Sequence, residues 1–175
     1  NGHPDFVALN PDLASANVCV IGNGNVAIDI ARLLVKTREE LSPSDITNDS
    51  LDALQASSVT DVFMLGRRGP VEAKFTNVEL REMGKLENCA PQIDGSIIPD
   101  AVPEDEDMSD LDRRLRERNL ATLREFVPRQ PDEFEKRVHF QFYAAPREIL
   151  GGDKVEGVRL ERTEVVDGRA VGTGE

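Results

Sequence analysis

The sequence predicts an α/β fold: a Rossmann-type parallel sheet with helices on both faces, a helical insertion and an antiparallel β-meander. The first observation behind this prediction is an apolar run at residues 18–21, which leads through a glycine-bearing turn into an amphipathic stretch at residues 28–35. The second is another apolar run, residues 62–65, which ends in a second glycine-bearing turn. Short apolar runs of this kind are typical of buried parallel strands.

Residues 1–16 are rich in Pro, Asp and Asn and predict a linker from a missing domain, while residues 17–175 predict one domain. Helices are expected where apolar residues recur every three or four positions, and strands where they run together or alternate. The sequence predicts strands at residues 17–21, 61–65 and 139–144, and meander strands at 147–150, 154–166 and 169–172. It predicts helices at 25–37, 76–86 and 110–126. Two short helices are expected between the first two strands, one that begins at Ser42 or Ser44 and one that begins at Asp49.

Several details of this assignment rest on single residues. Asn25 is the expected cap of the first helix. Thr76 and Glu79 have the spacing of a capping box, which would hold Glu79 against the start of its own helix. Residues 92–108 are acidic and contain prolines, so they predict an exposed excursion. A Rossmann sheet continues after such a meander with a return strand, which this sequence lacks, so one sheet edge is expected to be bare or to be completed by a strand from a neighbour.

The first glycine-bearing turn has the sequence Gly22-Asn23-Gly24-Asn25-Val26-Ala27. Gly22 allows a tight turn, and Gly24 allows the backbone to approach a pyrophosphate without a Cβ in the way. Ala27 takes the third glycine position of the motif, which fits a slightly wider spacing between helix and strand. The turn also aims the unpaired amides of the following helix at a ligand. It therefore predicts a pyrophosphate-binding site.

The second turn has the sequence Gly66-Arg67-Arg68-Gly69-Pro70. An NAD site places a carboxylate at the end of the second strand to accept hydrogen bonds from the ribose, and this turn has none. Guanidinium groups match phosphate geometry and stay charged, so Arg67 and Arg68 favour the 2′-phosphate of NADP(H). The alternative is a solvated turn with two ordinary arginines. The two turns are about twice as far apart as the usual ~20 residues, and residues 37–58 are the excess.

Three segments together resemble the NADP-binding domain of the adrenodoxin reductases and the related actinobacterial ferredoxin–NADP reductases. They are the first turn with its flanks (residues 20–32), the arginine turn, and the segment Phe75-Thr76-Asn77-Val78-Glu79-Leu80-Arg81-Glu82. The insertion at residues 37–58 and the opening phrase Gly2-His3-Pro4-Asp5-Phe6 are similar to the same family. The resemblance therefore covers nearly the whole chain.

The resemblance implies a flavoprotein of the glutathione-reductase structural class, which passes a hydride from NADPH to FAD and then single electrons to an iron–sulfur ferredoxin. It implies that residues 23–26 line the pyrophosphate and that Glu79 lies near the nicotinamide, with Glu82 one helical turn further on. A solvated pair on one helix face is the alternative for these two carboxylates. The cofactor-binding residues expected in all are Gly22, Asn23, Gly24, Asn25, Val26, Ala27, Arg67, Arg68, Glu79 and Glu82.

The family begins with an FAD-binding unit that has its own glycine-rich turn, and only residues 1–16 precede the first strand here. We therefore expect an excised NADP-binding domain that binds nucleotide, has no catalytic residue of its own and is inactive without a flavin partner. Two other functions stay open. One is the NADPH-binding domain of another flavin-dependent reductase, of the glutamate synthase small-subunit type. The other is a non-catalytic module that senses NADPH.

The composition narrows the choice of partners. A formal charge of −12 and an isoelectric point near 4.7 argue against nucleic acid and against an acidic membrane surface. No apolar stretch approaches the ~20 residues of a membrane span. Cys19 and Cys89 form no Cys-x-x-Cys motif, which excludes a dithiol mechanism and fits a reducing compartment, most simply the cytoplasm. With His3 and His139 as the only histidines, no metal site is expected.

Four arginines gather on the helix predicted at residues 110–126, namely Arg113, Arg114, Arg116 and Arg118. One interpretation is a solvated helix face, balanced by the acidic residues between the arginines. The other is a basic patch that docks an acidic ferredoxin on an otherwise acidic domain.

Overall fold

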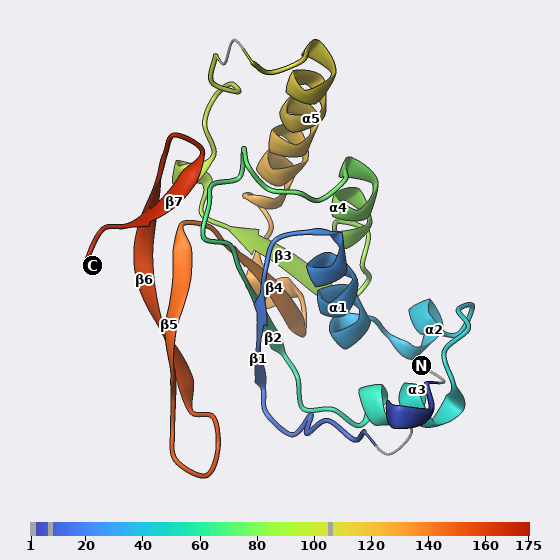
Figure 1. Ribbon diagram of the computed structural model, residues 1–175. Coiled ribbons are helices and arrows are strands. Elements are labelled where there is room, and N and C mark those ends of the chain that lie inside the picture. Colours follow the sequence, from blue (N-terminus) through green and yellow to red (C-terminus); the bar gives the residue numbers. More distant parts are fainter. Residues whose placement is uncertain (1–2, 7–8, 105–106) are drawn as a thin grey trace.

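The computed structural model describes residues 3–6, 9–104 and 107–175 (Figure 1). Residues 1–2 and 7–8 of the predicted linker and residues 105–106 of the predicted excursion lie outside the described residues. The strands are β1 (Asn17–Ile21), β2 (Asp61–Leu65), β3 (Cys89–Ile93), β4 (Lys136–Gln141), β5 (Ala144–Leu150), β6 (Gly157–Val166) and β7 (Arg169–Gly172). The helices are α1 (Asn25–Val35), α2 (Arg38–Leu41), α3 (Asn48–Gln55), α4 (Asn77–Met83) and α5 (Asp110–Phe126), with 3₁₀ turns η1 (Pro4–Phe6), η2 (Gly95–Ile97) and η3 (Pro131–Glu133).

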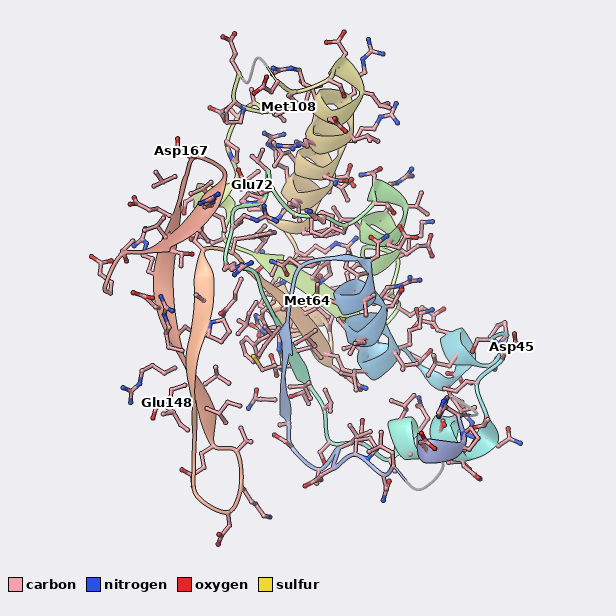
Figure 2. All side chains as sticks on the ribbon, viewed as in Figure 1. Asp45, Met64, Glu72, Met108, Glu148 and Asp167 are labelled. Atoms are coloured by element: carbon pink, nitrogen blue, oxygen red, sulfur yellow. The ribbon has the colours of Figure 1, made fainter. Side chains whose placement is uncertain are left out.

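A four-stranded parallel sheet with the strand order β1-β2-β4-β3 forms the centre of the fold. The central strands β2 and β4 alternate largely between buried and partly exposed residues, because successive side chains point to opposite faces. Val62 and Met64 of β2, with Val138 and Phe140 of β4, point to the buried face. Met64 is fully buried and lies at the centre of the molecule (Figure 2). The predicted Rossmann-type parallel sheet is confirmed.

Helices α1, α4 and α5 cover one face of the sheet and form the core with it. Their contribution includes Ile28, Leu80, Leu120 and Leu123, each at most 1% exposed. The opposite face carries no helix among the described residues, and the antiparallel meander β5-β6-β7 lies on that side (Figure 1). The sequence predicted helices on both faces. The open face is a mixed surface, on which the charged Asp61 and Arg137 lie beside apolar residues such as Phe63 and Leu65, and residues 155–160 approach it in place of a helix.

The predicted helical insertion at residues 37–58 is confirmed as α2 and α3. Helix α2 begins after Thr37, which forms a reciprocal capping box with Glu40, so the starts expected at Ser42 or Ser44 are wrong. Thr47 caps α3 in the same position. Leu41, Leu51 and Leu54 pack into the same core as the sheet and α1. The insertion therefore needs no hydrophobic core of its own.

The sequence missed strand β3 because Pro91 lies in it. Proline has no amide hydrogen to donate, and it is tolerated in a sheet on an edge strand, which is the place that β3 has. The exposed excursion predicted for residues 92–108 is also only partly present. Ile98 and Val102 are 8% and 4% exposed and pack into the core between the acidic residues. Ile97 also packs against the core, and Arg124 donates to the carbonyl of Asp100, so this segment is held at several points although its composition is that of a loop.

The meander is confirmed, with β6 paired antiparallel to β5 and to β7. Asp167 and Gly168 make the last turn with positive φ angles of 48° and 71°. Strand β4 ends at Gln141, earlier than expected, because Tyr143 turns the chain with a φ of 55°. The outer edge of β1 pairs with no strand among the described residues.

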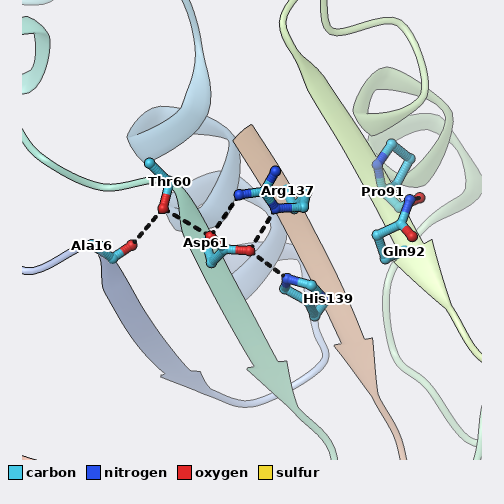
Figure 3. A network of polar contacts seen from close by, with 7 residues as sticks. All are labelled: Ala16, Thr60, Asp61, Pro91, Gln92, Arg137 and His139. Atoms are coloured by element: carbon cyan, nitrogen blue, oxygen red, sulfur yellow. Dashed lines mark hydrogen bonds and ion pairs between the residues drawn. The ribbon is translucent and has the colours of Figure 1, made fainter. Parts of the chain in front are cut away.

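A polar network fixes the register of β2 against β4 (Figure 3). Arg137 donates two hydrogen bonds to the Asp61 carboxylate, at 2.8 and 3.0 Å, and Nε2 of His139 lies 2.8 Å from the same group. The Arg137 guanidinium holds the pKa of Asp61 well below its usual range, with help from His139 and the Thr60 hydroxyl. The His139 ring stacks on the Phe63 ring, with 4.4 Å between the two ring centroids. Asp61 lies directly opposite Arg137, and Phe63 directly opposite His139, in the pairing of β2 with β4. The ion pair and the ring stack therefore stabilise this register, which in turn decides where β2 ends relative to β4.

Candidate functional site

The two glycine-bearing turns meet at the carboxyl edge of the sheet. Strands β1 and β2 pair in step up to Ile21 with Leu65, so the turns begin at the same level. The amide of Gly22 then donates to the carbonyl of Leu65 at 2.8 Å. Both turns line one cavity of about 340 Å³, together with residues 72–74, Phe142 and Pro146. This edge is where α/β sheets bind their ligands.

The first turn has the backbone that its glycines were expected to allow. Gly22 has a φ of +136°, a conformation that side chains with a Cβ rarely adopt. Gly24 is the N-terminal cap residue of α1. Because glycine has no side chain, it offers no acceptor to the first amides of the helix. A Cβ at Gly24 would meet only the carbonyl of Lys74 at 4.0 Å, so the protein itself leaves open space above this turn.

Asn23 joins the two turns. Its side chain fills the space that a Cβ on Gly66 would need, which is why the second turn begins with glycine. With its amide nitrogen facing the carbonyl of Gly22 and its oxygen facing the amide of Gly66, Asn23 forms hydrogen bonds of 3.0 and 3.2 Å. Asn23 therefore has a structural role in addition to lining the cavity.

The next three residues of the first motif point elsewhere. The expected cap by Asn25 is wrong, since its Oδ1 accepts a hydrogen bond of 2.7 Å from the amide of Thr76. Val26 is 72% exposed at the start of α1. Ala27 is buried, and its Cβ lies 4.0 Å from the position of a Cβ on Gly22, which is the close helix–strand packing that a small residue allows here. None of the three lines the cavity.

The arginine turn presents two cations to the cavity. Arg67 is exposed and Arg68 is half-buried, and both line the cavity beside the first turn. Neither guanidinium forms an ion pair or a hydrogen bond with a residue that the structure describes. Adjacent arginines repel each other, and without carboxylate partners among the described residues both guanidinium groups are available to an anion.

The meander holds this turn in place, which the sequence did not indicate. The Thr163 hydroxyl donates to the carbonyl of Arg67 at 2.8 Å, and the amide of Tyr143 donates to the carbonyl of Arg68 at 3.2 Å. Thr163 is 5% exposed although its neighbours on β6 are charged. Burial, with the nearby Glu72 carboxylate, raises the pKa of Tyr143, so its ring remains neutral beside the turn. The backbone of the arginine turn is therefore fixed by residues far along the chain.

Glu79 and Glu82 lie on α4, against α1, and do not line the cavity. The predicted capping box is wrong, because the Thr76 side chain makes no cap. One carboxylate oxygen of Glu79 is buried without a partner among the described residues. Glu82 lies 2.6 Å from Lys85 and 3.5 Å from Arg32, and the hydrogen bond from Lys85 lowers its pKa.

Fold and turns define a Rossmann-type α/β domain. The chain is a homologue of the NADPH-ferredoxin reductases and the NADPH:adrenodoxin oxidoreductases. It is 39% identical over 166 residues to "NADPH-ferredoxin reductase FprA" of Mycobacterium tuberculosis, which covers 95% of this chain and 36% of the relative. It is 37% identical over 187 residues to "NADPH:adrenodoxin oxidoreductase, mitochondrial" of Arabidopsis thaliana, covering 100% of this chain and 39% of the relative.

The solved structures agree with the sequence comparison. The structure titled "Mycobacterium tuberculosis FprA in complex with NADPH" matches with a TM-score of 0.85 and 37% identity, over 99% of this chain and 38% of that one. The chain thus spans a little over a third of the length of these relatives. No protein-family model matches the sequence. Among the described helices, none is long and apolar enough to cross a bilayer.

The anchoring by Thr163 is testable through stability. Thr163→Val keeps the shape of the side chain but leaves the Arg67 carbonyl without its donor, so we expect the free energy of unfolding to fall by about 1–3 kcal/mol. Urea denaturation measures it, with hydrogen exchange of the amides at residues 67–69 as a local readout. Thr173→Val is the matched control, because the Thr173 hydroxyl bonds a backbone carbonyl at an exposed position. Equal losses in the two variants would contradict the anchoring role.

Proposed function

We propose that this chain binds NADPH and, within a whole FAD-dependent reductase of the adrenodoxin-reductase type, presents its nicotinamide to the flavin. The observation that carries the proposal is the pair Arg67 and Arg68, which lack described carboxylate partners and line one cavity with a pyrophosphate-type turn. The names of the relatives support the cofactor and the reaction. Hydride transfer to FAD and single-electron transfer to a ferredoxin are the chemistry that the cofactors supply.

The chain's own contribution is position and charge. Arg67 and Arg68 would take the 2′-phosphate of the adenosine, because a guanidinium donates several hydrogen bonds to one phosphate. The pyrophosphate would lie over Gly22, Asn23 and Gly24, which line the cavity just before α1 and where the two glycines leave the backbone accessible. FAD would be bound mainly by residues outside the aligned third of the relatives. The chain alone would then bind nucleotide without turning it over.

We assign Glu79 and Glu82 to the nicotinamide end of the cofactor. Glu79 has one buried carboxylate oxygen without a described partner, which is costly. Because Glu79 does not line the cavity, the assignment requires α4 to move so that the ligand can donate to this oxygen. Glu82 is tied to Arg32 and Lys85, so it would orient α4 and would not accept from the ligand directly.

The chain also fits a reducing compartment, most simply the cytoplasm. Both cysteines are free, with Cys19 exposed and Cys89 buried. Burial raises the pKa of the Cys89 thiol to about 12, which keeps it in its unreactive form. An exposed free thiol such as Cys19 persists where thiols are kept reduced.

Replacing either arginine tests the cofactor assignment. Arg67→Ala and Arg68→Ala each remove charged hydrogen bonds worth about 1.5–3 kcal/mol, so the Kd for NADPH rises by about ten- to a hundredfold. The Kd for NADH stays unchanged, because NADH has no 2′-phosphate. Isothermal titration calorimetry of the chain measures both. Arg169→Ala, at an exposed and unpaired arginine of the meander, controls for the loss of one positive charge. Equal weakening for NADPH and NADH would contradict the assignment.

The first half of α5 supports a ferredoxin-docking surface. This half projects beyond the sheet (Figure 1), and Leu111 and Leu115, expected to pack inward, are 67% and 43% exposed. Arg114 and Arg118 are exposed one helical turn apart beside them. Asp110, Asp112 and Glu117 lie on the same half of α5, which leaves its four arginines in excess by one. A stripe of exposed arginines and leucines on a chain of charge −12 suits an acidic protein partner. We propose that an iron–sulfur ferredoxin docks there.

Charge reversal tests the docking surface. The double variant Arg114→Glu/Arg118→Glu should weaken binding of a [2Fe–2S] ferredoxin to the chain by at least tenfold at low salt and flatten its salt dependence, because the attraction becomes repulsion. Biolayer interferometry across a salt series gives both quantities. Lys154→Glu/Arg169→Glu changes the net charge equally on the meander. If both double variants lose affinity to the same extent, only the overall charge matters and the docking surface is wrong.

A further inference from the structure

Lys74 lies beside the glycine turn although 50 residues separate them in the sequence. Its backbone forms an isolated parallel bridge with Gly24, and its amide donates to the carbonyl of Asn23 at 3.2 Å. Two residues further on, the amide of Thr76 donates to the Asn25 side chain at 2.7 Å. Residues 74–76, just before α4, therefore run along the first turn and are hydrogen-bonded to it. These bonds fix the backbone of Lys74 beside that turn.

Lys74 lines the same cavity as the two arginines. Lys74 is exposed and lines the cavity with both turns. Its ammonium forms no ion pair or hydrogen bond with a described residue. Glu72 is the one carboxylate on the cavity wall, and it accepts a hydrogen bond from the amide of Gly69 at 3.0 Å. Three cations against one anion is an unusual balance on a chain whose acidic residues outnumber its basic ones by 33 to 21.

We infer that Lys74 is a third phosphate-binding cation, which pairs with the pyrophosphate of the dinucleotide. This inference rests on the proposed function, that is, on NADPH occupying the cavity. The pyrophosphate is assigned to Lys74 because its backbone pairs with Gly24, at the start of α1, while the 2′-phosphate belongs to Arg67 and Arg68. An ammonium on a flexible stem serves as a point charge and needs no fixed planar partner, which suits an exposed position.

Lys74→Met tests the inference, since it removes the charge and keeps an unbranched apolar stem. NADPH is titrated into the whole chain by calorimetry at several salt concentrations. We expect the Kd of Lys74→Met to rise about three- to tenfold, with a shallower dependence on salt because one phosphate contact is lost. Lys154→Met, at an exposed lysine of the meander, is the control and should bind as the unmodified chain does.

A double-mutant cycle with Arg67→Ala identifies the phosphate. If Lys74 and Arg67 hold different phosphates, the fold-changes of the single variants multiply in Lys74→Met/Arg67→Ala, because independent sites are additive in free energy. A double variant no weaker than the worse single variant would overturn the pyrophosphate assignment. An unchanged Kd in Lys74→Met, beside NADPH binding by the unmodified chain, would overturn the role of Lys74 alone. Absence of NADPH binding by the unmodified chain would overturn the proposed function itself and this inference with it.

Discussion

The parallel pairing of β1 with β2 is the constraint on which the rest of the structure depends. The two strands run in step from Asn17 with Asp61 to Ile21 with Leu65, so two segments about 40 residues apart end at one edge of the sheet. The hydrogen bond from Gly22 to Leu65 extends the ladder past the strand ends and joins the turns. A slip by one residue would reverse every side chain of β2 and separate the glycine turn from the arginine turn.

Segments far along the chain form hydrogen bonds with these two turns and hold them in place. The network around Asp61 fixes β2 against β4 at the far end of the sheet, and the β4–β5 connection then bonds the arginine turn from its other side. The meander adds the Thr163 hydroxyl, and the segment before α4 adds Lys74. The proposed phosphate site would thus gain its order from backbone hydrogen bonds, because Arg67 and Lys74 are exposed and Arg68 is only half-buried.

The sequence predicted those parts that depend on local pattern. The bounds of β1, β2, β7 and α5 agree with the expected ones. Long-range contacts decided the rest. Asn25 bonds Thr76 in place of its own helix, and Thr163 reaches a carbonyl 96 residues away, which no periodicity encodes. Pro91 kept the edge strand β3 from being predicted. Local propensity disfavours proline in a strand, whereas the position of β3 at the sheet edge allows it. The composition of residues 92–108 likewise gave no sign that Ile98 and Val102 are buried.

We propose that both turns form one site for one NADPH molecule. The most direct test is a titration of isotope-labelled chain with NADPH, followed by NMR of the backbone amides. We expect the amides of residues 22–26 and 66–69 to shift together, with one Kd and saturation at one equivalent, while those of β7 stay unchanged. Shifts confined to one turn, or two different Kd values for the two turns, would contradict it.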